Sequence, residues 1–145
     1  MRALVQRVSS ASVSIEGEVV GRIGAGLVVL LGVSRSDAEA QADRLADKVA
    51  RLRVFEGAER PMDRSLLDAG GAALCVSQFT LYGDTRRGLR PSFTDAAGPE
   101  PAERLYDRFC AGLRTRGVPV ETGRFGARMS LALTNEGPVT LLVEA

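Results

Sequence analysis

The chain has 145 residues, of which 45% are hydrophobic and 26% charged, values typical of a soluble globular protein folded as one domain over residues 1–145. Its net charge of +1 gives little general attraction to nucleic acid, and no apolar run reaches the roughly 18 residues of a membrane span. No histidine is present, which excludes Ser-His-Asp and Cys-His catalytic centres and removes the commonest zinc ligand.

We therefore expect neither a metal nor a cofactor. The N-terminus lacks the basic stretch and apolar core of a secretory signal, so a cytoplasmic protein is expected. Cys75 and Cys110 fit no metal-binding spacing and are expected to be buried small side chains.

The N-terminal third is predicted to be β-structure. Apolar and polar residues alternate, a turn at Glu16–Glu18 separates two alternating segments, and Gly24–Gly26 interrupts the pattern. Leu27–Val33 is a continuous apolar run, which predicts a strand buried on both faces. The strands predicted here are 3–7, 12–15, 19–23 and 27–33.

A helix is predicted next, with Ser36 and Glu39 as a capping box and an apolar stripe from Ala38 to Leu52. A short strand at 53–55 and a polar loop at 56–65 follow, before an apolar strand that ends at Ser77.

A second helix is predicted to begin near Pro99 or Pro101 and to end by Gly117. Strands at 118–122 and on both sides of Gly137–Pro138 complete the chain. This order predicts a mixed α/β (α+β) fold, a curled sheet or small β-barrel with two main helices outside it.

Two motifs carry candidate chemistry. The first is Ser77-Gln78-Phe79-Thr80, a polar segment at the end of an apolar strand, where polar groups are held rigidly and can reach a pocket. Taken alone, its hydroxyls more often cap backbone groups than perform chemistry. The second is Asn135-Glu136-Gly137-Pro138, which predicts two extended segments joined at a tight corner with carbonyls free to hold a small ligand. An ordinary turn is the alternative.

Arginines are a third feature. The chain has eighteen arginines and a single lysine, Lys48, and Arg86, Arg87 and Arg90 cluster just after the first motif. Guanidinium groups suit phosphate oxygens, so the cluster is either a phosphate-binding segment or a solvated loop.

Together the two motifs resemble the signatures of the D-aminoacyl-tRNA deacylases, the chiral-proofreading hydrolases of translation. Ser77–Leu81 and Asn135–Thr140 match the two signature segments, and the resemblance covers essentially the whole chain. The other matching segments are 1–8, 26–33, 90–93, 125–129 and the C-terminal strand.

The resemblance implies a small β-barrel, a homodimer, and an esterase that releases D-amino acids from the 3′ end of aminoacyl-tRNA. It implies that Gly137–Pro138, joined by a cis peptide bond, inserts into the active site of the opposite subunit. There its carbonyls would accept the α-ammonium group of the D-form and reject the L-form. Glycine mischarged on tRNA(Ala) is achiral and is expected to be a further substrate.

The resemblance also places Ser77, Gln78, Phe79 and Thr80 at the catalytic centre, with Arg7, Asn135 and Met129 supporting the site. Arg7 would hold the Gly-Pro corner, although by pattern alone it fits a solvated face equally well.

Without a basic triad, such an enzyme would use the neighbouring ribose hydroxyl, a positioned water, and main-chain N–H groups near Gln78, Phe79 and Thr80 as oxyanion donors. Thr80 would position the substrate or, alternatively, act as a nucleophile that lacks a basic partner.

Two other functions compete with this one. The first is an editing deacylase for a mischarged L-aminoacyl-tRNA, which Phe79 argues against because related editors tend to carry a smaller residue there. The second is a non-catalytic nucleic-acid-binding module, for which a near-neutral chain with no Trp and two Tyr is poorly equipped.

Overall fold

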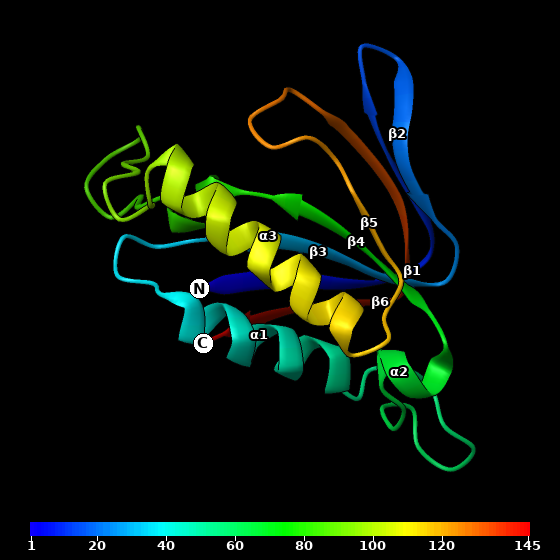
Figure 1. Ribbon diagram of the computed structural model, residues 1–145. Coiled ribbons are helices and arrows are strands. Elements are labelled where there is room, and N and C mark those ends of the chain that lie inside the picture. The colour runs from blue at the N-terminus through cyan, green and yellow to red at the C-terminus, as the bar shows by residue number, and fades with distance from the viewer.

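The computed structural model covers residues 1–145 and shows a mixed sheet that curls toward a barrel, with the helices outside it (Figure 1). The predicted fold class is confirmed. In chain order the elements are β1 (Arg2–Ile15), β2 (Glu18–Ile23), β3 (Gly26–Gly32), α1 (Glu39–Arg51), α2 (Leu66–Ala69), β4 (Ala72–Ser77), the 3-10 turn η1 (Phe79–Tyr82), α3 (Pro99–Thr115), β5 (Val120–Thr122) and β6 (Ser130–Glu144).

β1 is one long strand where two were predicted. It pairs antiparallel with β6 along one edge, and with β3 and then β2 along the other. The ladder with β6 shifts register between Val8 and Ser10, so an irregularity carries the strand through the polar segment that suggested a break. β4 and β5 continue the sheet from β3 by parallel pairing.

The curl of the sheet brings β2 back over β5. At Gly21 an added Cβ would lie 2.7 Å from the carbonyl oxygen of Thr122, so only glycine permits this approach. The turn that starts the curl has φ values of 50° at Glu16 and 81° at Gly17, as a two-residue hairpin turn requires.

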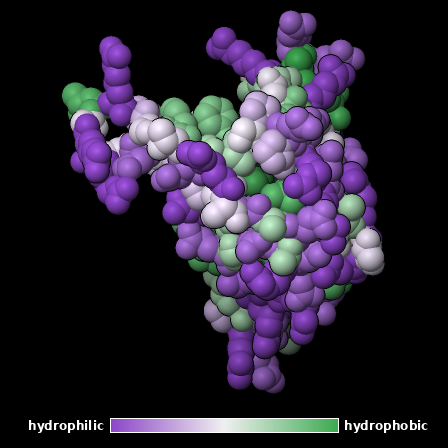
Figure 2. Space-filling model, turned by 60° about the vertical axis from the view of Figure 1, so that its left-hand side comes forward, coloured by the Kyte–Doolittle hydropathy of each residue, from purple (hydrophilic) through white to green (hydrophobic).

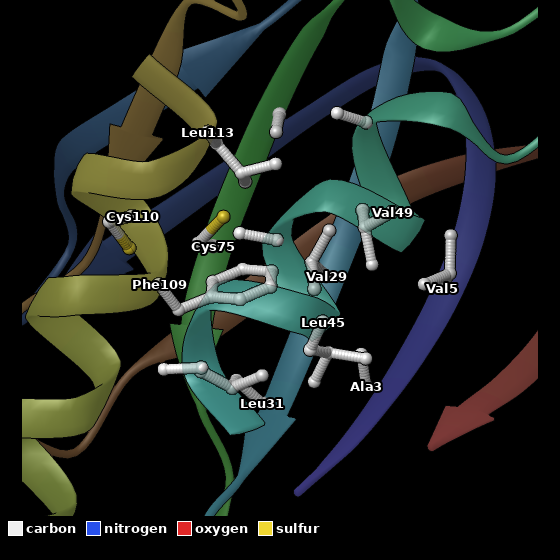
Figure 3. Close-up of a cluster of buried hydrophobic side chains, with 14 of the residues drawn as sticks. Ala3, Val5, Val29, Leu31, Leu45, Val49, Cys75, Phe109, Cys110 and Leu113 are labelled. Carbon is white, nitrogen blue, oxygen red and sulfur yellow. The ribbon is translucent and has the colours of Figure 1, made fainter. Parts of the chain in front are cut away.

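Each face of the curled sheet has its own apolar core. The outer core holds 25 buried residues between the sheet and helices α1 and α3, and Leu45, Phe109 and Leu31 lie at its centre (Figure 3). Cys75 and Cys110 are buried in this core, as predicted. A smaller inner core consists of Val8, Ala11, Val13, Ile23, Val28, Leu74 and Val76.

The predicted capping box of α1 is wrong. The N-cap is Ala38, whose N–H donates to Gln41 Oε1 at 2.8 Å. Asp37 stays outside the helix because its carboxylate accepts from the Ser34 N–H at 2.7 Å and pairs with the N-terminal ammonium group at 2.7 Å. Ser36 contacts the Ser34 hydroxyl instead of capping the helix.

No helix in the structure is both long enough and apolar enough to cross a membrane.

Candidate functional site

A cavity of about 600 Å³ opens where β3 and β4 end, between η1, the start of α3 and the loop before β6. Twelve of its sixteen lining residues are hydrophobic. Besides Ser77 and Gln78, the lining consists of Leu30, Val33, Val76, Phe79, Phe93, Ala96, Ala97, Pro99, Ala102, Phe125, Gly126, Ala127, Met129 and Leu131. An apolar cavity with a few convergent polar groups is the usual form of a small-ligand site.

The first motif forms one wall of this cavity because β4 turns directly into η1. The Gln78 N–H donates to the Leu31 carbonyl at 2.8 Å, which extends the pairing with β3 past the end of β4. The turn then closes through the Leu81 N–H to the Gln78 carbonyl at 3.2 Å. Gly32 lets η1 lie against β3, since an added Cβ would be 3.1 Å from Leu81 Cβ.

This geometry decides which backbone donors are available. The N–H groups of Phe79 and Thr80 precede the first hydrogen bond of η1, so neither has a partner within the turn. The Gln78 N–H, also expected from the sequence to be an oxyanion donor, is already bonded to Leu31. Two of the three expected main-chain donors therefore remain.

The Thr80 hydroxyl is held by its neighbour. Gln78 Nε2 donates a hydrogen bond to Thr80 Oγ1, and no carboxylate or amine side chain is hydrogen-bonded to that oxygen. The hydroxyl keeps its own proton as a donor and has no general base. This arrangement suits a group that orients a substrate.

Two aromatic rings stand at the mouth of the cavity. Phe79 is 54% exposed and meets Phe93 edge to face, with ring centroids 5.1 Å apart. Phe125 and Met129 lie in the segment before β6 and also line the cavity. The sequence alone gave no role to Phe93 or Phe125, although both stand in segments that match the family.

The second motif is a bulge in one continuous strand, so the predicted corner between two strands is wrong. Val8 on β1 pairs with Asn135 and Gln6 pairs with Thr140, which leaves four residues of β6 opposite Arg7 alone. Both halves of β6 pair with the same long strand, and for that reason the chain direction is kept across the bulge.

Asn135 closes the base of this bulge. Its Oδ1 accepts from the Val139 N–H at 3.1 Å, and its Nδ2 donates to Thr140 Oγ1 at 2.8 Å. The Gly137–Pro138 peptide bond is cis, as the resemblance implied, and both residues are exposed. Gly137 has a φ of 125°, a value that favours glycine.

Arg7 lies beneath the bulge with a relative exposure of 9%, so the solvated-face interpretation is wrong. Its Nε donates to the Glu136 carbonyl at 3.1 Å, and one terminal nitrogen donates to the Val54 carbonyl at 2.7 Å. The guanidinium group thus ties the bulge of β6 to the segment that follows α1.

The two motifs do not meet within one chain. Arg7 pairs with Leu27 on β3, whereas Ser77 pairs with Leu31, four residues further along the same strand. At about 3.3 Å per residue the bulge lies roughly 13 Å from the cavity along the strands. Ser77, Gln78, Phe79 and Met129 line the cavity and Thr80 adjoins it, while Gly137, Pro138, Asn135 and Arg7 lie apart from it.

Cys75 is not poised for catalysis. The contact with Cys110 and complete burial raise the pKa of the Cys75 thiol well above its ordinary value, so it stays protonated. No group of three or more His, Cys, Asp and Glu side chains is arranged to hold a metal ion.

Comparison with known proteins gives consistent matches over the full chain. The family model described as D-Tyr-tRNA(Tyr) deacylase matches residues 4–144. Proteins named D-aminoacyl-tRNA deacylase from Symbiobacterium thermophilum and Thermus aquaticus are 63% and 59% identical to this chain, covering 100% of it and 96% and 95% of their own lengths.

Two solved structures are also similar. One titled "c-Myc DNA Unwinding Element Binding Protein" has a TM-score of 0.95 at 40% identity and covers 100% of this chain and 99% of its own. A probable eukaryotic D-amino acid tRNA deacylase has a TM-score of 0.81 at 20% identity over 99% of this chain and 98% of its own, a likeness of fold.

Proposed function

The chain belongs to the D-Tyr-tRNA(Tyr) deacylase family, and we propose that it hydrolyses the ester of D-aminoacyl-tRNA to free tRNA and D-amino acid. The observation that carries the proposal is the Ser77–Thr80 motif, which forms the polar wall of an otherwise apolar cavity. Such an enzyme removes D-amino acids from tRNA during translation, in the cytoplasm.

The reaction does not require a basic side chain. A water oxygen attacks the ester carbonyl carbon, the bond from that carbon to the ribose oxygen breaks, and the ribose oxygen takes up a proton. Negative charge develops on the carbonyl oxygen, where the N–H groups of Phe79 and Thr80 would stabilise it. The adjacent ribose hydroxyl of the substrate would help to position the water.

Thr80 acts in this scheme as a positioning group. Its oxygen accepts from Gln78 Nε2, and no basic partner is present to remove its proton, as a nucleophilic hydroxyl would need. The aminoacyl ester at the end of the substrate is then held by the apolar walls of the cavity and by the Phe79 and Phe93 rings.

Chiral selection requires a second element near the α-carbon, and we assign it to Gly137–Pro138 of a partner subunit. The pair is exposed and remote from the cavity of its own chain. Its carbonyls would accept the α-ammonium group of a D-amino acid and leave no room for the L-form. Glycine is achiral, so glycyl-tRNA would be poorly rejected.

A homodimer that uses β6 would bring the two elements together. β6 pairs only with β1, so its other edge is free, and Leu141 and Leu142 are 40% and 54% exposed. A long free edge with apolar side chains can pair with a second copy of the chain. Twofold symmetry would then place the bulge of each subunit against the other subunit.

The function is tested by following release of labelled tyrosine from D-Tyr-tRNA and L-Tyr-tRNA at catalytic enzyme concentration. Loss of the D-ester alone is the expected result. Equal or preferential loss of the L-ester would support the editing alternative. Nucleic-acid binding with no ester cleavage would support a non-catalytic module.

The cross-subunit arrangement is tested by mixing two weak variants, one altered at Gly137 and one at Thr80. Random reassociation would form mixed dimers in which one site has both native elements, so about a quarter of native activity should return. If both elements act within one chain, mixing restores nothing. Gel filtration of the wild type checks that dimers are present.

A further inference from the structure

A second, polar cleft of about 690 Å³ lies on the other side of η1 from the apolar cavity. Phe79 at the start of η1 lines the cavity, and Tyr82 at its end lines the cleft. The two are three residues apart in a 3-10 turn, or about 6 Å along its axis. One extended ligand can therefore occupy both. The cleft is lined by Arg2, Ser34, Arg35, Ser36, Tyr82, Gly83, Asp84, Thr85, Arg86 and Asp95.

The rim of this cleft is a loop built to present arginines. Asp84 and Ser92 close its base through two backbone hydrogen bonds of 2.7 and 2.9 Å. Arg86, Arg87 and Arg90 lie between them and are exposed. The loop is the green segment at the left of Figure 1, and Figure 2 turns this side of the molecule forward and shows hydrophilic side chains extending from it.

Several of these cations have no carboxylate partner. Arg87 and Arg90 form no ion pair, and Arg35 donates only to the Thr94 carbonyl at 3.2 Å. By contrast, Arg104 and Arg108 on α3 and Arg116 at its C-cap are all paired with carboxylates of α1. The helical face is therefore neutralised, whereas the cleft and its rim keep an excess of positive charge.

The carboxylates that face the cleft do not cancel this excess. Asp84 is held by Arg86 in a forked contact of 2.9 and 2.7 Å, and this contact lowers the pKa of Asp84 to about 2. Glu144 pairs with Arg2 at 2.8 Å, and only Asp95 lacks a cation. Within the cleft the unpaired Arg35 therefore accompanies the unpaired Asp95 and the hydroxyls of Ser36 and Thr85. The exposed Arg87 and Arg90 of the rim loop add two further positive charges that no carboxylate pairs with.

We propose that this cleft and its arginine rim bind the phosphates of the single-stranded 3′ end of the tRNA as it leaves the apolar cavity. Guanidinium forks and hydroxyls are the groups that proteins commonly use on RNA phosphates. The terminal ester would lie in the cavity, the strand would pass over η1, and the phosphates that follow would meet Arg35, Arg87 and Arg90. The proposal rests on the deacylase function and names the binding site for the rest of the substrate.

The test compares two substrates that share the reacting ester. D-Tyr-tRNA carries the phosphates, and 3′-(D-tyrosyl)adenosine carries none. For R35A, R87A and R90A we expect KM for D-Tyr-tRNA to rise about three- to fivefold for each arginine removed, with kcat unchanged. Hydrolysis of the adenosine ester should match that of the wild type. R44A, which removes an exposed arginine without an ion pair from α1, is the matched control.

Salt supplies an independent readout. Removal of one phosphate-binding arginine should reduce the slope of log KM against log salt by about 0.7 for a single strand. The proposal is overturned if R87A/R90A binds tRNA as R44A does, or if both substrates lose activity equally. Should the wild type cleave neither ester, the deacylase function fails, and anisotropy of uncharged tRNA with the same variants still decides whether the cleft binds RNA.

Discussion

Replacing Arg7 tests how the Gly-Pro bulge is held. The buried guanidinium donates to Glu136 and Val54 carbonyls at 3.1 and 2.7 Å. Hydrogen bonds from a charged group contribute about 1.5–3 kcal/mol each, and part of this is offset because Arg7→Ala also removes a buried charge. We expect Arg7→Ala to lower the free energy of unfolding by about 3 kcal/mol, or roughly 6–12 °C in Tm for a protein of this size.

Arg7→Lys separates charge from geometry. A lysine keeps the charge but has one donor group at its tip and cannot span both carbonyls, so about half of the loss should remain. Urea denaturation of these variants measures the free energy of unfolding, with the exposed Arg22→Ala as the control. The ratio of D-Tyr-tRNA to L-Tyr-tRNA hydrolysis shows whether the bulge keeps its geometry. A wild-type free energy of unfolding for Arg7→Lys, or a loss below about 1 kcal/mol for Arg7→Ala, would refute the reasoning.

Three further predictions follow from single contacts. Gly137→Ala should lower the free energy of unfolding by about 1–3 kcal/mol more than a strain-free change and reduce D-ester hydrolysis, because its Cβ would be 3.0 Å from Val139. The control is Gly88→Ala, where the φ of 123° is equally strained but no atom lies near the added Cβ. Equal losses for the two variants in a denaturation assay would show that packing is irrelevant. Thr80→Val should reduce kcat about 100-fold while Thr80→Ser stays active, and an acyl-enzyme trapped in single-turnover quench experiments would contradict the positioning role. Burial raises the pKa of Tyr106, whose hydroxyl donates to the Cys75 carbonyl at 2.7 Å. The free energy of unfolding should therefore fall above a pH of about 10, where the tyrosine ionises in the unfolded chain but not in the folded one. Tyr106→Phe should flatten this decline in urea denaturation at alkaline pH, and an unchanged slope would contradict the role of Tyr106.

The two long helices, α1 and α3, and most strands could be predicted because each is marked by a local pattern. The short helix α2 was not predicted, and the strand expected at 53–55 is only an isolated bridge between Phe55 and Arg64. Leu27–Val33 is apolar throughout, and the β3 that it predicted is buried between β1 and β4. The capping of α1 could not be predicted in this way. Ser36 and Glu39 have the right spacing, but Asp37 is held outside the helix by the N-terminal ammonium group, a contact between residues distant in sequence.

The two candidate motifs could be picked out from the sequence, but their arrangement in space could not. The Ser77–Thr80 motif was found because polar residues end an apolar strand, and in the structure Ser77, Gln78 and Phe79 line a cavity. The bulge was mistaken for a corner because its four extra residues show only in the register with β1. Arg7 was left undecided because a strand pattern cannot reveal that a carbonyl of a later loop lies beneath it.

The supporting residues explain how a site without a histidine can hold its functional groups in a fixed geometry. The proposed oxyanion donors are backbone groups of η1, which Gly32 and the Leu31 carbonyl fix against β3. The proposed chiral element is a backbone bulge, which Arg7 and Asn135 fix against β1. Backbone groups cannot be tuned by changing their own side chains, so their geometry depends on the residues that hold them. Substitutions at Gly32, Asn135 and Arg7 should therefore affect selectivity as strongly as substitutions at residues that touch the substrate.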